Sequence, residues 1–268
     1  MDARLIRLID SFRAMKAVAV AYSGGVDSSL ALWAAAKALG ERALGVSVRS
    51  EFVCAQERRR ADRIAAHLRR DVGAQVRVRH IRVLANERLR KNPEDRCYLC
   101  KQLVLAELRA EALERLGEQA RLAEGTNADD DPTRPGRRAV AEAGALSPLA
   151  ACGIDKAAVR ELARQVGLEN ADDPSNSCLA TRVPTHQELT FARLTAIEGL
   201  ERAAQDLGLT DLRARLVPGR PGIPGANGDA VRLLVRPGQL PFAQALAKQL
   251  EERAHFIGVT HFSLGERT

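Results

Sequence analysis

The chain has 268 residues, of which 46% are hydrophobic and 28% are charged, and its net charge is +7. This composition is typical of a soluble globular protein with one large domain or two smaller ones. The longest apolar runs fall far short of the roughly 20 residues of a membrane-spanning helix, and charged residues interrupt the N-terminal stretch where a signal peptide would have its apolar core. We therefore expect a cytoplasmic protein with no membrane partner.

The positive charge by itself does not predict a nucleic-acid partner. The basic residues are mostly arginines spread along the whole chain, and only 3% of the residues are aromatic. Binding surfaces for nucleic acid usually show clustered cations and aromatic side chains that stack on bases. An anionic small molecule fits this composition as well as RNA does.

The first 175 residues alternate between predicted strands and helices. Such alternation predicts an α/β fold with a doubly wound, Rossmann-like parallel sheet, whose ligand lies at the carboxyl ends of the strands. The predicted strands are 17–22, 42–50, 74–83 and 121–124, and the predicted helices are 29–37 (stopped by Gly40), 55–70, 86–117 with a break at Pro93, and 156–166.

After Pro184 the pattern changes to that of a small α+β domain. It predicts a helix over 189–207, strands over 211–217, 230–236 and 258–264, a helix over 241–254, and a Pro/Gly-rich loop over 218–229. We therefore divide the chain into a nucleotide-binding domain, 1–175, and a C-terminal domain for substrate binding or oligomerisation, 188–268.

A glycine-rich turn between the first strand and the first of these helices indicates phosphate binding. Its sequence is Ser23-Gly24-Gly25-Val26-Asp27-Ser28. Paired glycines let backbone N–H groups converge on an anion, and the helix N-terminus adds unpaired donors and a positive dipole end. The Walker A motif and the G-x-G-x-x-G dinucleotide motif are both missing.

The hexapeptide resembles the SGGxDS loop of the PP-loop ATP pyrophosphatases. The resemblance implies that the loop, Ser23 to Ser28, holds the β- and γ-phosphates of ATP, that Asp27 helps to hold Mg²⁺, and that ATP is cleaved between its α- and β-phosphates. We expect Thr126, Asn127 and Asp129, which follow the strand 121–124, near the α-phosphate or a second metal position.

Two cysteine motifs stand out among the five cysteines. Cys97 and Cys100 form a CxxC pair beside basic residues at a helix start, and Cys178 lies in a polar segment four residues before Arg182. Such surroundings favour thiolates. The pair alone could be half of a zinc site, a redox pair or two buried small residues; with a third cysteine it could hold a [4Fe-4S] cluster with one open iron.

Further motifs resemble the LarE family of ATP-dependent sulfur transferases over about residues 15–215. They are Arg134-Pro135-Gly136, Ser147-Pro148-Leu149, Lys156 with Val159-Arg160-Glu161-Leu162-Ala163, Gly167-Leu168, Pro174-Ser175 and Cys178-Leu179-Ala180-Thr181-Arg182. The resemblance implies that a carboxylate of pyridinium-3,5-dicarboxylate mononucleotide is adenylylated and converted to a thiocarboxylate, for a nickel-pincer cofactor. It also implies a homo-oligomer, expected to be a hexamer.

The family resemblance leaves two sources for the sulfur. In one version Cys178 is sacrificed and becomes dehydroalanine; in the other Cys97, Cys100 and Cys178 carry a [4Fe-4S] cluster that passes on a bound sulfide. Because all three cysteines are present, we favour the cluster. Arg134, Arg182, Arg213 and Arg215 are candidates for binding the phosphate and carboxylates of the substrate.

Two other functions remain open from the sequence. A tRNA thiolation enzyme also combines an SGGxDS loop with cysteine-bound clusters, although the C-terminal unit shows no recognisable RNA-binding appendage. A nucleotide-binding or iron–sulfur-binding module without turnover would bind ATP without releasing pyrophosphate.

Overall fold

The computed structural model describes residues 1–174, 176–217 and 230–267 and divides into two compact units. Unit 1 comprises Met1–Ile81 and Asp95–Asn176, and unit 2 comprises Arg82–Glu94 and Ser177–Thr268. The predicted Pro/Gly-rich loop, 218–229, lies outside the described residues. None of the described helices has the length and apolar character of a membrane span.

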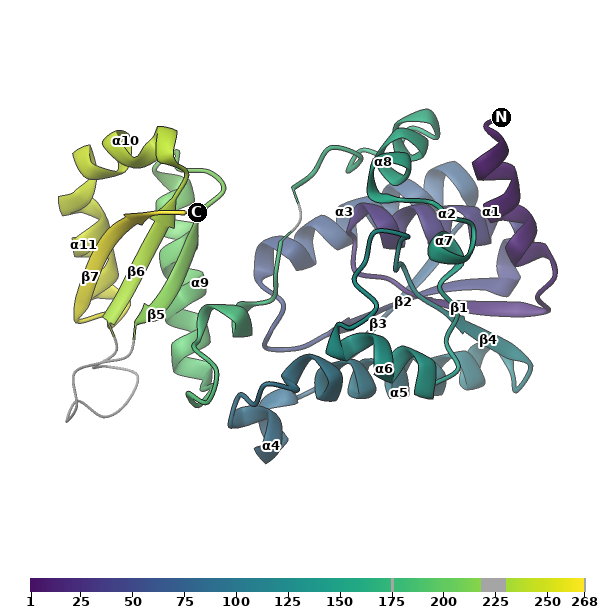
Figure 1. Ribbon diagram of the computed structural model, residues 1–268, viewed down its shortest axis with the longest axis horizontal. Helices are drawn as coiled ribbons and strands as arrows, with labels where there is room; N and C mark the ends of the chain where they lie inside the picture. Colours follow the sequence, from purple (N-terminus) through teal and green to yellow (C-terminus); the bar gives the residue numbers. More distant parts are fainter. Residues whose placement is uncertain (175, 218–229, 268) are drawn as a thin grey trace. The chain divides into compact units, whose positions relative to one another are not determined.

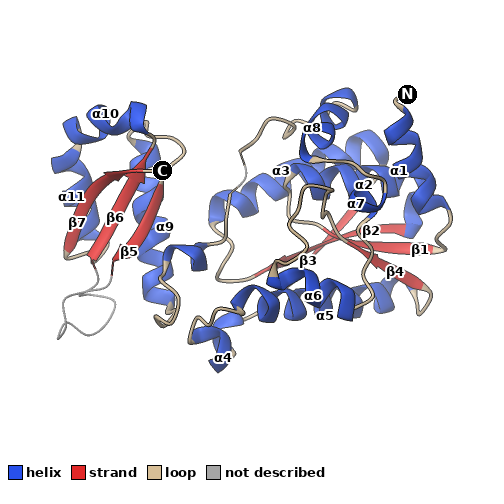
Figure 2. Ribbon diagram, viewed as in Figure 1, coloured by secondary structure: helices blue, strands red, loops and turns tan. Residues whose placement is uncertain are grey.

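Unit 1 is an α/β unit whose four-stranded sheet is parallel throughout, which confirms the predicted α/β class with a parallel sheet (Figures 1 and 2). The strand order is β3-β2-β1-β4, so the order reverses between β1 and β4. In parallel sheets ligands bind at such a reversal, beyond the carboxyl ends of the strands. The strands are β1 (Ala17–Ala21), β2 (Ala43–Arg49), β3 (Gln75–His80) and β4 (Ala120–Ala123).

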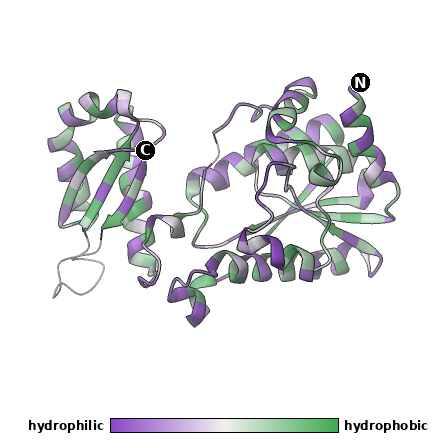
Figure 3. Cartoon of the chain, viewed as in Figure 1, coloured by the Kyte–Doolittle hydropathy of each residue, from purple (hydrophilic) through white to green (hydrophobic). Residues whose placement is uncertain are grey.

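Helices cover both faces of this sheet (Figure 1). Side chains alternate between the faces along a strand: Val18 and Val20 join the core under α1, α2, α3 and α8, whereas Ala19 joins the core under α5 and α6. The helices are α1 (Ala3–Arg13), α2 (Val26–Leu39), α3 (Ala55–Val72), α5 (Arg96–Leu116), α6 (Pro135–Glu142), α7 (Pro148–Ala151) and α8 (Lys156–Gln165), with a 3₁₀ turn η1 (Gly40–Arg42). Figure 3 shows the mainly hydrophobic central strands between these layers.

Helix α2 begins at Val26, three residues before the predicted start. Gly25 has extended dihedral angles, φ −74° and ψ 157°, and occupies the N-cap position. Asp27 and Ser28 therefore belong to the first helical turn rather than to the preceding loop. This places their side chains beside the unpaired N–H groups of the helix N-terminus.

Unit 2 is a small α+β unit with a three-stranded mixed sheet in the order β5-β6-β7. Strand β5 pairs antiparallel with β6, and β6 pairs parallel with β7. The predicted helix 241–254 is two helices, because Leu246 leaves helical geometry with φ −93° and ψ 3°. The elements are η2 (Val83–Ala85), α4 (Glu87–Arg90), η3 (Leu179–Arg182), α9 (Phe191–Asp206), β5 (Arg213–Val217), β6 (Ala230–Val235), η5 (Pro237–Gln239), α10 (Leu240–Ala245), α11 (Ala247–Phe256) and β7 (His261–Glu266).

The segment Arg82–Glu94 joins unit 2 through backbone hydrogen bonds. The N–H of His186 donates to the carbonyl of Asn92 at 2.9 Å, and the N–H of Leu189 donates to the carbonyl of Arg90 at 2.8 Å. The Asn92 side chain, fully buried, donates to the carbonyl of Pro184 at 2.8 Å. The predicted break between helices at Pro93 thus lies close to a change of unit, between Glu94 and Asp95.

Candidate active site

The glycine loop is held against helix α3 at Gly24. This residue has a φ of +80°, and a Cβ added to it would lie 2.5 Å from the Cα of Ala61. Both the dihedral angle and the close backbone approach require glycine. The loop is closed by Ser28, whose hydroxyl donates to the carbonyl of Gly25 at 3.0 Å and accepts from the N–H of Ser23 at 3.2 Å.

The end of β4 packs against the start of α2. A Cβ on Gly125 would lie 2.8 Å from the backbone nitrogen of Ser28, so this second glycine permits the contact. The two strand ends that the sequence analysis singled out therefore meet, as the reversal of strand order between β1 and β4 predicts.

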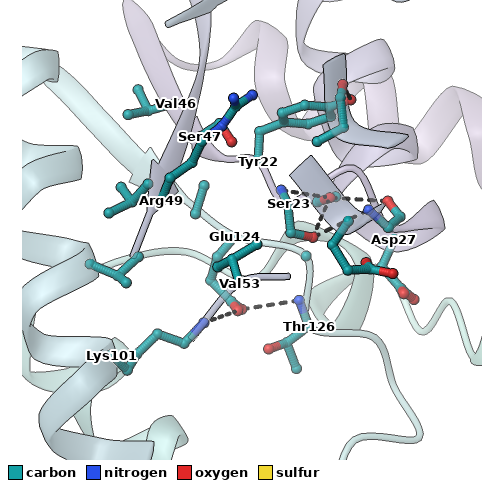
Figure 4. Close-up of a pocket in the computed structure, with 18 of the residues that line it drawn as sticks. Tyr22, Ser23, Asp27, Val46, Ser47, Arg49, Val53, Lys101, Glu124 and Thr126 are labelled. Atoms are coloured by element: carbon teal, nitrogen blue, oxygen red, sulfur yellow. Dashed lines mark hydrogen bonds and ion pairs between the residues drawn. The ribbon is translucent and has the colours of Figure 1, made fainter. Parts of the chain in front are cut away.

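A cavity of about 380 Å³ in unit 1 opens where these segments meet (Figure 4). One part of its wall is polar and comes from the loop and the end of β4. The residues from these two segments are Ser23, Gly25, Asp27, Ser28, Glu124, Gly125 and Thr126. The remaining wall comes mainly from β2, α3 and α5 and includes Arg49, Arg58 and Lys101.

Apolar groups form one side of the cavity. Val46, Val53, Ala61 and Val104 line it, together with Tyr22. Tyr22 is buried, its hydroxyl donates to the carbonyl of Ala61 at 2.9 Å, and burial raises the pKa of its phenol above the usual value. An apolar wall beside a polar loop suits a ligand with a flat ring at one end and anionic groups at the other.

Asp27 is the centre of a small charged cluster at the cavity. Its carboxylate forms an ion pair with the ammonium of Lys156, the first residue of α8, and accepts a hydrogen bond from the side-chain amide of Asn127 at 3.0 Å. The backbone N–H of Lys156 donates to Asp129 at 2.9 Å, which fixes the start of α8. A cation thus lies beside the carboxylate predicted to bind magnesium.

Glu124 is a buried carboxylate in the same cavity, only 4% exposed. Burial acts to raise its pKa, but the charge of Lys101, 3.5 Å away, and hydrogen bonds from Thr126 and Ser147 outweigh burial, so the pKa lies below its usual value. The Thr126 N–H and the Ser147 hydroxyl donate to it at 3.1 and 2.7 Å. Glu124 is therefore ionised at neutral pH.

The predicted nucleotide residues fall into three groups. Ser23, Gly25, Asp27, Ser28 and Thr126 line the cavity, whereas Gly24 and Val26 support the loop from behind. Asn127 and Asp129 do not line the cavity: Asn127 donates to Asp27, and Asp129 accepts from the N–H of Lys156 at the start of α8. Arg134, which was predicted to bind substrate, does not line this cavity. Its side chain is largely exposed and pairs with Asp130 at 3.7 Å.

The three predicted cysteine ligands of the cluster are divided between the two units. Cys97 and Cys100 occupy the first turn of α5 in unit 1, exposed and half-buried respectively, and Cys178 is exposed in unit 2. Among the described residues, no three His, Cys, Asp or Glu side chains gather into a metal site. The cluster therefore stays a prediction that would require the units to bring these sulfurs together.

The chain enters the Cys178 segment beside a residue that lines the cavity. The side-chain amide of Asn176, the last residue of unit 1, donates to Glu57 at 3.3 Å, and Glu57 is part of the cavity wall. Cys178 follows two residues later, and two residues of chain span at most about 7 Å. Chain connectivity alone thus limits how far this thiol can lie from Asn176.

The arginines predicted to bind substrate in unit 2 differ in accessibility. Arg182 is 2% exposed; it pairs with Glu201 at 3.0 Å and donates to the carbonyls of Ser177 and Cys178 at 2.7 and 3.1 Å. It therefore holds the turn that carries Cys178. Arg213 and Arg215 share the face of β5 opposite to the buried Ala214; Arg215 is exposed, whereas Arg213 is half-buried. Burial, and then the charges of Arg182 and Arg267, lower the pKa of Arg213.

Sequence comparisons identify the family. No protein-family model matches the chain. An uncharacterized protein of Synechocystis is 32% identical over 216 residues, which is 80% of this chain and 78% of the relative. The pyridinium-3,5-bisthiocarboxylic acid mononucleotide synthase of Lactiplantibacillus plantarum is 30% identical over 209 residues, 78% of this chain and 74% of the relative. The chain belongs to the LarE family. An uncharacterized protein of Methanocaldococcus jannaschii is 28% identical over 201 residues, 75% and 74% of the two chains.

Three polar residues of this LarE-family site were given no role in the sequence analysis. Lys156 carries part of the family resemblance, but only the structure shows its contact with Asp27. Glu124 directly follows the apolar strand β4, and a carboxylate at a strand end before glycine is a signal that could have pointed to it. Lys101 follows the CxxC pair, and nothing in the sequence connects it with Glu124.

Proposed function

We propose that this LarE-family protein is an ATP-dependent sulfur transferase that adenylylates a carboxylate of pyridinium-3,5-dicarboxylate mononucleotide and converts it to a thiocarboxylate. The observation that carries the proposal is that the glycine loop with Asp27 and the Glu124–Thr126 segment line one and the same cavity. The named synthase of L. plantarum, 30% identical, supports the substrate class.

The loop would bind the phosphates that leave as pyrophosphate. The N-terminus of α2 and the loop N–H groups stabilise anions there, and Lys156 adds a positive charge next to Asp27. The carboxylate oxygen of the substrate attacks the α-phosphorus of ATP, the bond between the α-phosphorus and the bridging oxygen breaks, and pyrophosphate leaves. The product is an acyl-adenylate, in which AMP has become a good leaving group.

Asp27 fits a magnesium site, because hard carboxylate oxygens at the cavity wall are the ligands that this ion prefers. Bound Mg²⁺ would offset the charge of the phosphates. Lys156 pairs with Asp27, so a metal bound by this carboxylate would compete with the lysine for it.

Cys178 would act in the second half of the reaction. A sulfur nucleophile attacks the acyl carbon and displaces AMP. If Cys178 is itself the donor, its Sγ forms a thioester, and loss of the Cα proton then breaks the Cβ–Sγ bond. This elimination leaves a thiocarboxylate on the substrate and dehydroalanine on the protein.

Cys97 and Cys100 fit the alternative sulfur source. They are not packed in the core, and they lie three positions apart in the first turn of α5. A [4Fe-4S] cluster held by these cysteines and Cys178 would supply a bound sulfide in place of the cysteine sulfur.

An anaerobic assay with ATP, Mg²⁺ and the dicarboxylate mononucleotide tests the proposal. The expected products are AMP, pyrophosphate and a thiocarboxylate identified by mass spectrometry. Formation of ADP, or ATP binding without pyrophosphate release, would contradict it. Iron content and the intact mass of the protein after turnover then distinguish the two sulfur sources: the sacrificial route lowers the mass by that of H₂S.

A further inference from the structure

Asn170 lies directly behind the glycine loop. It follows α8 in unit 1 and is fully buried. Its side-chain nitrogen donates to the carbonyl of Gly24 at 2.9 Å and to the hydroxyl oxygen of Ser29 at 3.0 Å. Because a backbone carbonyl can only accept, the amide nitrogen is the atom that faces Gly24. A residue 146 positions away thus holds the middle of the loop.

The contact with Gly24 sets the orientation of the next peptide group. The described chain contains no cis peptide bond, and in a trans peptide the C=O and N–H bonds point in opposite directions. Because the Gly24 carbonyl points towards Asn170, the N–H of Gly25 points away from it. Gly25 lines the cavity, and its N–H makes a long hydrogen bond of 3.3 Å to the Ser23 hydroxyl.

The second hydrogen bond of Asn170 supports the following carbonyl. The Ser29 hydroxyl accepts from Asn170 and donates to the carbonyl of Gly25 at 2.9 Å, and Ser28 donates to the same oxygen at 3.0 Å. Two successive loop carbonyls are therefore held on the protein side. Their fixed positions leave the loop N–H groups to face an anion.

The side-chain oxygen of Asn170 is buried and has no hydrogen-bond partner among the described residues. An unsatisfied buried acceptor destabilises a fold, and an apolar side chain of similar size would avoid this cost. The amide at this position is therefore explained by its two donated hydrogen bonds rather than by packing.

We infer that Asn170 is a positioning residue for pyrophosphate binding: by holding the Gly24 carbonyl it directs the Gly25 N–H towards the departing phosphates. The inference rests on the proposed function. Asn170 is not among the residues that line the cavity, and its removal should weaken the binding of ligands that occupy the loop more than the binding of ligands that occupy the apolar wall.

Calorimetric binding of inorganic pyrophosphate with Mg²⁺, and separately of AMP, to the full-length protein tests the inference. Asn170→Ala should weaken pyrophosphate binding by about tenfold or more, the effect of losing one oriented charge-assisted hydrogen bond, while AMP binding changes less than about twofold. Asn170→Asp, which keeps the shape but turns a donor into an acceptor, should weaken pyrophosphate binding at least as much. It also serves as the test variant if the alanine variant does not fold.

Asn92→Ala is the matched control, because Asn92 is an equally buried amide that donates to backbone carbonyls, but in unit 2. It should leave both affinities unchanged. Equal losses for pyrophosphate and AMP in the Asn170 variants, or no loss for pyrophosphate, would overturn the positioning role. If the unmodified protein binds neither ligand, the proposed function is wrong and the inference fails with it.

Discussion

Lys156 and Asp27 form an ion pair although 129 positions separate them in the sequence. The pair joins the first turn of α2 to the first residue of α8 at the edge of the cavity. A lysine beside a carboxylate predicted to bind magnesium supplies positive charge at the place where pyrophosphate would leave.

Lys156→Met should therefore slow adenylylation strongly. Removing one preorganised group that stabilises developing charge lowers kcat by roughly 100-fold or more, and we expect that loss in the rate of pyrophosphate release. Lys37→Met is the control, because Lys37 lies near the other end of α2, exposed and over the ring of Trp33. An unchanged kcat in Lys156→Met would show that the ion pair only supports the fold.

Gly24→Ala should abolish ATP binding by displacing the loop. The new Cβ would meet the backbone of Ala61 at 2.5 Å, in a residue whose φ of +80° already disfavours a side chain. Gly73→Ala separates the two causes, because Gly73 also has a positive φ, +67°, but nothing within 4 Å of an added Cβ. This control should lose about 1 kcal/mol of stability and bind ATP normally, as measured by calorimetry.

Lys101→Met should make the stability of unit 1 more sensitive to acid. The folded protein lowers the pKa of Glu124, so the ionised carboxylate stabilises the fold above its unfolded pKa, near 4.5, and this contribution is lost as the pH falls through the folded pKa. Lys101→Met removes the largest of the causes that lower this pKa, while Thr126, Ser147 and Arg137 remain. The pKa of Glu124 should therefore rise relative to the unmodified protein, and the acid transition should move to higher pH.

Urea unfolding followed through Trp33, the single tryptophan and a residue of unit 1, measures this effect at several pH values. The free-energy difference between the two proteins should shrink once Glu124 is protonated in both. In a Glu124→Gln background, Lys101→Met should cost little at any pH. A pH-independent difference in the unmodified background would show that Lys101 acts through packing alone.

Arg182→Ala should destabilise unit 2 by about 3–5 kcal/mol, because it leaves Glu201 as a buried charge without its arginine. Hydrogen exchange of peptides from α9 and β5 measures the loss. Arg202→Ala is the control on the same helix, and this exposed residue should change stability by no more than about 0.5 kcal/mol. Unchanged exchange in Arg182→Ala would mean that the arginine is held for the substrate rather than for the fold.

The strands and helices of both units follow closely from local sequence patterns, for identifiable reasons. Apolar runs bounded by polar residues specify β1 and β2, and glycine ends α2 and α3. Helix α1 was not predicted, although its buried residues Leu5, Leu8 and Phe12 follow helical spacing and Asp2 caps it. The short helices α6 and α7 begin at prolines within segments interpreted only as family motifs.

The candidate site was only partly predictable from the sequence, because several of its contacts join segments that lie far apart in the chain. The glycine loop is a local motif, and the strand order explains its meeting with Thr126. The contacts of Asn170 with Gly24 and of Lys156 with Asp27 depend instead on how α8 packs beside α2. The same holds for Arg182, whose burial against Glu201 follows from the folding of unit 2 and not from any local pattern.

Cysteine variants distinguish the two sulfur routes, because only the cluster route needs all three sulfurs. Cys97→Ser and Cys100→Ser should abolish thiocarboxylate formation and lower the iron content if a cluster supplies the sulfide, while pyrophosphate release continues. If Cys178 is sacrificed, both variants should still give one turnover and a protein lighter by the mass of H₂S. Cys152→Ser is the control, since burial raises the pKa of that thiol and makes it a poor nucleophile. Thiocarboxylate formation by Cys178→Ser would contradict both routes, because each requires a sulfur at this position.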